Sequence, residues 1–311
     1  MTTSFSPADM PQRRPPEIGP VTEGHAPKIR AFAFFPYRGD RGAVDPGDLA
    51  KVAWRDVLTA LADMAEPEEW TGPNPTGRTL PILDSFLRYT YERLVMEDKI
   101  LVTESGDWAA FNTGLLTPHA EEIFGLFERN RSEDHQRWVF LRWAPESDRE
   151  ILRSFPEPPL MAEYVSNSSD LVYDWRRELK VAYDHILNDN IGRFPAHLAS
   201  QPIAAKRELD AALASTLKRV RRNYKVVVPQ WYPMLGESGG QFLMPLDLTG
   251  TGGADLALVV STVGDRAYRG HTVLTLDMAY TNARLVARPD SEWLVPAAGA
   301  IPAADEAYGS E

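Results

Sequence analysis

Apolar residues in the first half of the chain recur at helical spacing in two segments. Asp48 precedes a run in which every third or fourth residue is apolar, which predicts a helix over 48–64 with Asp48 as its N-cap. The Pro-, Gly- and Thr-rich segment 66–81 interrupts this pattern. A second amphipathic helix is predicted over 82–97, and the aromatic density of 29–37 predicts a short strand before both helices.

A β-hairpin is predicted directly after the second helix. Residues 99–103 and 108–111 are strand-like, and they flank the turn sequence Glu-Ser-Gly-Asp at 104–107. A helix followed by a hairpin is typical of a winged-helix module, which binds nucleic acid. Because the preceding helix is not basic, we favour a purely structural layer over that interpretation. Residues 137–143 predict another strand.

The second half predicts helices followed by a sheet. A long helix is expected over 170–189 and another over 204–223. The next segments alternate between strand-like and turn-rich sequence, which favours an antiparallel meander covered by helices. We therefore predict an α+β fold, with a final helix starting near Leu276. The four expected strands are 225–231, 241–248, 255–262 and 271–276.

Composition sets limits on this picture. The 311 residues include 33 basic and 44 acidic side chains, so the net charge of −11 argues against a surface that follows nucleic acid without preference, although a local basic groove is still allowed. The absence of cysteine excludes disulfides and thiolate-ligated metals.

We expect a soluble, cytoplasmic protein that does not enter membranes. Its expected parts are a disordered leader (1–27), an N-terminal helix and hairpin subdomain (28–150), a C-terminal α+β subdomain carrying the site (151–296) and a flexible tail (297–311).

Polar side chains cluster where the last predicted strand passes into the last helix. Asp277, Tyr280 and Arg284 follow at spacings of three and four, so they share one helix face. A carboxylate, a phenol and a guanidinium together can position a phosphate or an amide. The equally weighted alternative is a buried ion pair with a tyrosine lid.

A second candidate lies at 182–195. His185 and Asp189 are four residues apart on a predicted helix, so the carboxylate can orient the imidazole for proton transfer. The alternative is an ordinary helix C-terminus, with Asp189 solvated and His185 packed on the sheet. A third candidate combines Asn223, Lys225 and Gln230 at the next helix and strand ends, where the alternative is a basic helix end that complements the helix dipole.

Motifs of known catalytic and metal-binding classes are absent from the sequence: there is no GxxxxGK[ST], HExxH, EF-hand loop or GxSxG. A metal is therefore not implied by any motif. Asp189, Asp255 and Asp277 would bind Mg²⁺ if the fold brought them together.

Several longer segments resemble a bacterial family of domains of unknown function, family 3825. The resemblance covers about residues 80–294, and its most specific motifs are Phe-Asn-Thr-Gly-Leu at 111–115, Asn-Tyr-Lys at 223–225 with Pro-Gln at 229–230, and the segment 274–285. It implies a nucleotide or RNA context, because relatives are sometimes fused to cold-shock or zinc-ribbon modules. This chain departs from that pattern, since it is acidic and carries no such module.

These observations lead to a hydrolase hypothesis, in which the protein binds a nucleotide-like phosphate ligand and cleaves a phosphodiester or pyrophosphate bond. The alternatives are a non-catalytic protein that binds RNA or nucleotide, and a protein-interaction scaffold; the oligomeric state is left open. The expected catalytic residues are His185, Asp189, Asp277 and Arg284, and the expected ligand-binding residues are Asn112, Arg193, Asn223, Lys225, Gln230, Tyr280 and Asn282.

Overall fold

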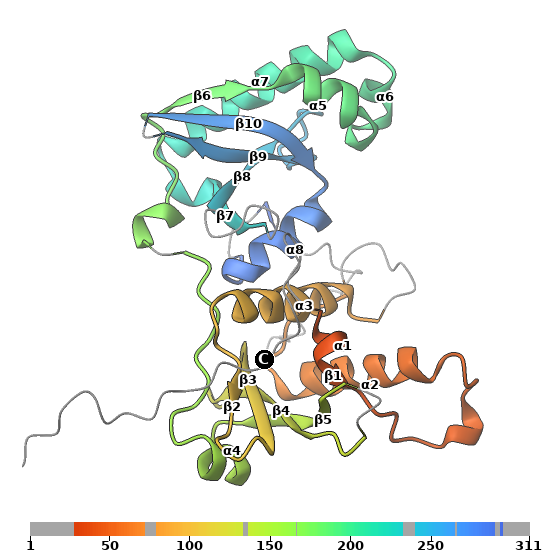
Figure 1. Cartoon of the computed structure of the whole chain (residues 1–311). Coiled ribbons are helices and arrows are strands. Elements are labelled where there is room, and N and C mark those ends of the chain that lie inside the picture. The colour runs from red at the N-terminus through yellow and green to blue at the C-terminus, as the bar shows by residue number, and fades with distance from the viewer. Residues whose placement is uncertain are drawn as a thin grey trace, which may run out of the picture. The chain divides into compact units, whose positions relative to one another are not determined.

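The computed structural model describes residues 28–71, 79–132, 136–165, 167–232, 240–264, 266–289 and 293–294 (Figure 1). The expected leader 1–27, the tail 297–311 and residues 237–239, between the predicted strands 225–231 and 241–248, lie outside these residues. The chain divides into two compact units: the first contains residues up to Pro67 and Thr90–Ala162, and the second contains Glu68–Tyr89 and the residues from Glu163 onward. Within the described residues, no helix is long and apolar enough to cross a membrane.

The first unit is built on a five-stranded sheet with the order β1-β5-β4-β3-β2. Strands β2 to β5 pair antiparallel with their neighbours in sequence, while β1 pairs parallel with β5. Phe127 lies at the centre of an aromatic core, with ring centroids 5.3 Å from Phe32 and 5.6 Å from both Phe111 and Phe140. The elements are α1 (Ile29–Phe32), β1 (Ala33–Phe34), η2 (Arg41–Ala43), α2 (Leu49–Met64), α3 (Pro81–Met96, whose residues up to Tyr89 belong to the second unit), β2 (Leu101–Val102), β3 (Trp108–Leu116), β4 (Glu122–Arg129), β5 (Trp138–Pro145) and α4 (Arg149–Ser154).

Both helices predicted for this half are confirmed as α2 and α3, and the predicted hairpin is the pair β2 and β3. The strand expected over 29–37 is wrong, because the segment begins with one helical turn before the two-residue strand β1. Ile29 and Phe32 are three residues apart and both buried, and a helical turn brings them to the same side. Strand β4 was not predicted. Its Gly125 lies under the Phe111 ring, where a Cβ atom would approach a ring carbon to 2.9 Å.

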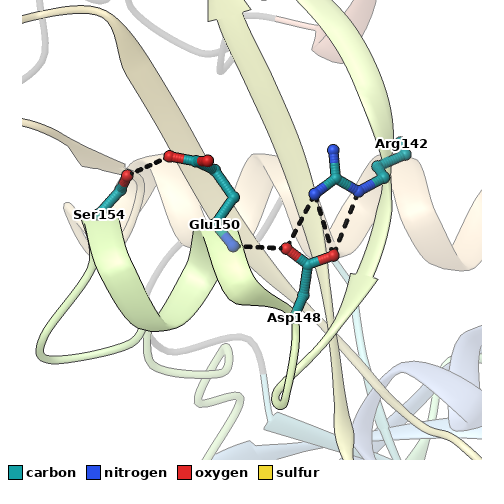
Figure 2. A network of polar contacts seen from close by, with 4 residues as sticks. All are labelled: Arg142, Asp148, Glu150 and Ser154. Carbon is teal, nitrogen blue, oxygen red and sulfur yellow. Dashed lines mark hydrogen bonds and ion pairs between the residues drawn. The ribbon is translucent and has the colours of Figure 1, made fainter.

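The short helix α4 is fixed by a polar network around Asp148 (Figure 2). Asp148 is the N-cap: its Oδ1 accepts a hydrogen bond from the Glu150 N–H at 2.8 Å, and its two oxygens also accept bonds from the Arg142 guanidinium. Ser154 Oγ donates to Glu150 at 2.6 Å inside the helix. Burial alone would raise the pKa of Asp148, but the hydrogen bond from Glu150 and the charge of Arg142 together lower it below its usual value.

Replacing Asp148 with alanine should lower the free energy of unfolding by about 1 kcal/mol, because the helix loses its N-cap acceptor. A folded-state pKa below the unfolded value means that this contribution is present above about pH 4 and is lost as the pH falls through the folded pKa. Urea unfolding of D148A and wild type at pH 7 and at pH 3 measures both effects. The matched control is D170A, an exposed aspartate in the second unit; an equal loss at both pH values would contradict the assignment.

The second unit is built on another five-stranded sheet, with the order β6-β10-β9-β8-β7. Strand β8 pairs antiparallel with β7 and β9, and β9 pairs antiparallel with β10. Strand β6 pairs parallel with β10 at the other edge. The elements are η3 (Ser168–Leu171), β6 (Glu178–Val181), α5 (Tyr183–Asp189), η4 (Ile191–Arg193), α6 (Ala196–Ala199), α7 (Pro202–Val220), η5 (Tyr224–Val226), β7 (Val228–Trp231), β8 (Gly240–Leu246), β9 (Leu256–Val263), β10 (Ala267–Leu274) and α8 (Leu276–Val286).

Helices cover this sheet on both faces. Buried residues of α5, α6 and α7 form one core with every second residue of β8 and β9, including Met244 and Leu258. Successive strand residues point to opposite faces, so Leu243 and Val259 lie on the other face, and α8 contacts β7, β9 and β10 there. Both predicted helix segments, 204–223 and that starting near Leu276, are confirmed as α7 and α8. The mixed α+β fold is also confirmed.

The long helix predicted over 170–189 is wrong. The segment contains η3, strand β6 and the seven-residue helix α5. Along Glu178–Val181 exposed and half-buried side chains alternate, because the charged residues face outward while Leu179 and Val181 pack against the core. This period of two is the pattern of a strand, and pairing with β10 satisfies its backbone hydrogen bonds.

Candidate functional site

Helix α8 positions Arg284 and Tyr280 against a carboxylate from a distant part of the chain. Arg284 Nε donates to Glu68 Oε1 at 2.6 Å and its Nη2 donates to Oε2 at 2.9 Å, which is a bidentate ion pair. The Tyr280 hydroxyl donates to the same Glu68 Oε1 at 3.3 Å. Burial, followed by the charge of Glu68, raises the pKa of Tyr280 to about 12, so this hydroxyl stays a donor at neutral pH.

Two aromatic rings complete the surroundings of Arg284. Its guanidinium carbon lies 4.6 Å from the Phe86 ring centroid and 5.2 Å from that of Trp70. The side chains of Arg284 and Glu68 are only 11% and 5% exposed. The geometry is that of a buried ion pair with a tyrosine beside it. The charge of Arg284 is balanced by Glu68 within the second unit. On the same helix, Asp277 and Asn282 are half-buried.

Two of the expected ligand-binding residues bond to nearby backbone groups, and a third bonds to another side chain. Asn112 lies in the first unit, where its Oδ1 accepts from the Gly114 N–H and its Nδ2 donates to the Pro159 carbonyl. Asn223 caps η5 by accepting from the Lys225 N–H, and Lys225 itself is exposed. Gln230 is buried on β7 and donates to Gln241 at 2.8 Å.

The edge of the second sheet opens where β6 ends. Strand β6 pairs with β10 as far as Val181 and Gly270, and among the described residues no strand pairs with the rest of β10 on that side. Arg193 donates from its guanidinium to the Val273 carbonyl, and Thr272 donates from its hydroxyl to Asn190 at 3.0 Å. Side chains from α5 and η4 thus satisfy this edge, and they hold α5 next to β10.

His185 and Asp189 lie on the exposed side of α5. His185 Nδ1 and Asp189 Oδ2 are 2.5 Å apart, in the arrangement that the i, i+4 spacing predicts. Both side chains are more than half exposed, at 52% and 62%. The carboxylate engages Nδ1 and therefore leaves Nε2 of His185 as the nitrogen that can meet a ligand.

A second histidine, His271, lies on β10 near His185. It is half-buried at an irregularity of β10, where the pairing register with β9 shifts between Gly270 and Thr272. Burial lowers the pKa of His271 below its usual value, a hydrogen bond with the Arg269 carbonyl opposes this, and the charges of Arg269 and His185 lower it further. The imidazole of His271 is accordingly neutral at pH 7, and it lies near enough to His185 to be affected by its charge.

Two exposed cations lie on β10 and β6 near His271, and they point to the sheet face opposite α5, because Tyr268 and Leu179 next to them pack in the core with α5 and α7. Arg269 precedes His271 by two residues on β10, and its Cα partner on β6 is Lys180. Glu178 Oε2 lies 3.5 Å from Lys180 Nζ, and both of these side chains are well exposed. We call the group His185, Asp189, His271, Arg269 and Lys180 the edge site. It combines two imidazoles, one carboxylate and two cations around the open edge of β10.

The edge site gathers residues that sequence reasoning found and others that it missed. His185 and Asp189 were predicted, and Arg193 holds the neighbouring backbone. His271, Arg269 and Lys180 were missed, because their nearness depends on the pairing of β6 with β10. The signal that could have found them was the Arg-Gly-His sequence at 269–271 inside a strand-like segment, where a glycine often marks a bulge.

Metal binding has no support from side-chain clusters in the part of the chain that the structure describes: it contains no group of three His, Asp or Glu residues arranged to hold an ion. Asp255 is occupied, because its Oδ2 accepts the N–H groups of Leu248 and Thr249 at 2.7 and 2.9 Å. Asp189 is engaged with His185.

Comparison with known proteins identifies the family. The family described as Domain of unknown function (DUF3825) matches residues 61–293, a range that includes the edge site and the Arg284 ion pair. No curated protein and no solved structure matches the chain. Because the match extends over most of the sequence, the chain belongs to the family Domain of unknown function (DUF3825), as its motifs predicted.

Proposed function

We propose that the second unit is a hydrolase that binds a nucleotide-like phosphate ligand at the edge site and cleaves a phosphodiester or pyrophosphate bond. The observation that carries this proposal is the pairing of two imidazoles in different environments. His271 is kept neutral by burial and by neighbouring positive charge, whereas His185 is held by the Asp189 carboxylate. Two titratable groups with different environments at one place can divide the roles of base and acid.

The proposed reaction needs one proton acceptor, one proton donor and positive charge. His271 takes a proton from a water molecule, whose oxygen forms the new bond to phosphorus. The bond between phosphorus and the leaving oxygen breaks, and protonated His185 gives its proton to that oxygen. Arg269 and Lys180 balance the charge that develops on the phosphoryl oxygens. The products are two phosphate-containing fragments, or a phosphate ester and an alcohol, and no redox step is involved.

Arg284 has a different role in this proposal from the one that the sequence suggested. Its ion pair with Glu68 lies on α8, and α8 covers the face of the sheet opposite α5. We infer that Arg284 and Tyr280 stabilise the unit and that they do not touch the ligand. His185 keeps a role in proton transfer as its acid, and Asp189 orients the His185 imidazole.

The second candidate is binding without cleavage, and a row of polar residues favours it. The Cα register aligns Gln230, Gln241, Ser261, Arg269 and Lys180 across all five strands, on the same face of the sheet. Gln241 Nε2 donates to Ser261 Oγ at 2.8 Å, which continues the bond from Gln230. The amides of Gln230 and Gln241 are buried and hold one end of this row, and the cations Arg269 and Lys180 at its other end suit recognition of a phosphate.

An interaction scaffold is the third candidate, and it concerns the first unit. The hairpin of β2 and β3 follows α3 in the order of a winged-helix-like module, which we propose as its local arrangement. Its turn carries Glu104 and Asp107 and is therefore acidic. An acidic hairpin is unsuited to a phosphate backbone, so this candidate implies a protein partner.

The experiment that tests the hydrolase proposal is a turnover screen of the whole protein. Mononucleotides, dinucleotides joined by phosphodiester or pyrophosphate bonds, and short RNA are incubated with and without Mg²⁺, and the products are separated by chromatography. We expect one substrate class to be cleaved, and thermal shift to show stabilisation by a non-cleavable thiophosphate analogue. Stabilisation without any cleavage would support the binding candidate. The absence of both stabilisation and cleavage would reject the hydrolase and the binding candidates.

A further inference from the structure

A basic surface gathers at the C-terminal end of α7. Lys218 and Arg219 lie in its last turn, Arg221 and Arg222 follow directly, and all four side chains are exposed or half-exposed. The chain as a whole carries a net charge of −11, so this concentration of cations is local. We call these residues, with Trp175, Arg176, Arg177 and Tyr224, the α7 basic surface. Its parts come from two segments of the second unit, 175–177 and 218–224.

Trp175 joins these two segments. The guanidinium carbon of Arg176 lies 5.1 Å from its ring centroid, and that of Arg221 lies 5.4 Å from the same centroid. The Trp175 residue is 42% exposed, so part of the ring still faces solvent. Tyr224, directly after Arg222 and Asn223, is 61% exposed. Large aromatic side chains are thus presented among the cations, and both can offer a ring face to a ligand.

The charges of this surface are poorly balanced by carboxylates. Asp174 lies 3.6 Å from Arg176 and 3.9 Å from Arg177. Within the described part of the chain, no carboxylate forms an ion pair with Lys218, Arg219, Arg221 or Arg222. Lys206, near the start of the same helix, is by contrast paired, because its Nζ lies 2.8 Å from Asp210.

The helix dipole does not account for this arrangement. A cation in the last turn of a helix gains about 0.3–1 kcal/mol from the dipole, and the effect fades beyond that turn. Lys218 and Arg219 lie in that turn, but Arg176 and Arg177 belong to another segment. Two guanidinium groups beside one ring also repel each other. An anion bound between them would remove that repulsion.

We infer that the α7 basic surface binds single-stranded nucleic acid. The arginines contact consecutive phosphates, while Trp175 and Tyr224 stack on unpaired bases. Stacking requires a base face, which a duplex keeps inside its own stack, so the exposed rings favour a single strand. The surface is separate from the edge site, and this inference does not rest on the hydrolase proposal.

Fluorescence anisotropy with fluorescein-labelled 12-mers of uridine and of thymidine tests the inference on the full chain at 50 and 200 mM salt. W175A should weaken binding by about 5- to 150-fold, and W175F should retain most of the affinity because it keeps a stacking ring. R221Q/R222Q should weaken binding and reduce the slope of log affinity against log salt by about 0.7 for each phosphate that the variant no longer neutralises. The ratio of the two affinities identifies RNA or DNA as the preferred strand.

The matched control is R207Q, an exposed arginine on α7 away from this end, and it should bind as wild type. H185Q/H271Q should also retain binding, which separates failure of this inference from failure of the hydrolase proposal. Circular dichroism establishes that each variant is folded. The inference is overturned if the 12-mers do not bind, if W175A and R221Q/R222Q bind them like wild type, if a duplex binds equally well, or if phosphatidylserine vesicles bind through these residues in place of the strand.

Discussion

Replacing either His271 or His185 with glutamine should lower kcat for the cleaved phosphate ligand by about 10²- to 10⁴-fold, the usual contribution of one acid or base. Glutamine keeps a polar side chain of similar reach but cannot exchange a proton near neutral pH. Because the two histidines act in the same step, the double variant should be little slower than the slower single variant. Steady-state kinetics on the substrate found by the turnover screen measures these effects.

The dependence of kcat/KM on pH separates the roles of the two histidines. The folded-state pKa of His271 is lowered, so the proton acceptor remains neutral as the pH falls to about 6.5 and is lost only below that, when it protonates. The acid limb of the wild-type profile should therefore lie below pH 6.5, and H271Q should remove it. H197Q, which changes an exposed histidine of α6, should leave the profile unchanged. Full activity of H271Q would contradict the assignment.

Removal of the Asp189 carboxylate should have a smaller effect than removal of His185, because Asp189 orients the imidazole and does not meet the ligand. This ordering follows from the contact between Asp189 Oδ2 and His185 Nδ1. The local nature of this contact also explains why the sequence alone predicted the pair. Both partners lie within one helical turn, and the spacing of four residues fixes their relation whatever the rest of the fold does.

Secondary structure was predictable where one periodicity dominates a segment. Helices α2, α3, α7 and α8 each show a continuous apolar stripe, and their predicted positions are confirmed. The helix prediction for the segment 170–189 was wrong because its apolar residues are few and lie between charged residues. The decisive contribution there is the pairing of β6 with the much later strand β10, because the strand-like alternation along Glu178–Val181 extends over only four residues.

The candidate site was predictable only in its local parts for the same reason. His271 comes near His185, and Arg269 lies opposite Lys180, because β6 and β10 are neighbours in the sheet although they are far apart in the sequence. Glu68 is 216 residues from Arg284, so nothing near α8 indicated which carboxylate would meet this arginine. Residue type and spacing identified the groups that need partners, and the fold determined the partners.

Replacing Arg284 with methionine should lower the free energy of unfolding by about 3–5 kcal/mol, because the buried Glu68 carboxylate would keep its charge without a cationic partner. Methionine preserves most of the volume against Phe86 and Trp70, so the loss reports the charge more than the packing. Urea unfolding followed by tryptophan fluorescence measures the change, since Trp70 lies beside the guanidinium. R288M, which changes an exposed arginine just beyond α8, should change stability by less than about 0.5 kcal/mol.

A double-mutant cycle with Glu68 decides whether the pair is structural. E68M alone leaves Arg284 buried among aromatic rings without its carboxylate, and it should also be strongly destabilising. The double variant E68M/R284M removes both charges together, so it should be more stable than either single variant and give a coupling energy larger than the loss that either single variant causes. If Arg284 instead served the ligand, the double variant would be as stable as wild type and yet inactive. We expect it to cleave substrate at close to the wild-type rate, because the edge site keeps all its groups and α5, which carries His185 and Asp189, covers the other face of the sheet.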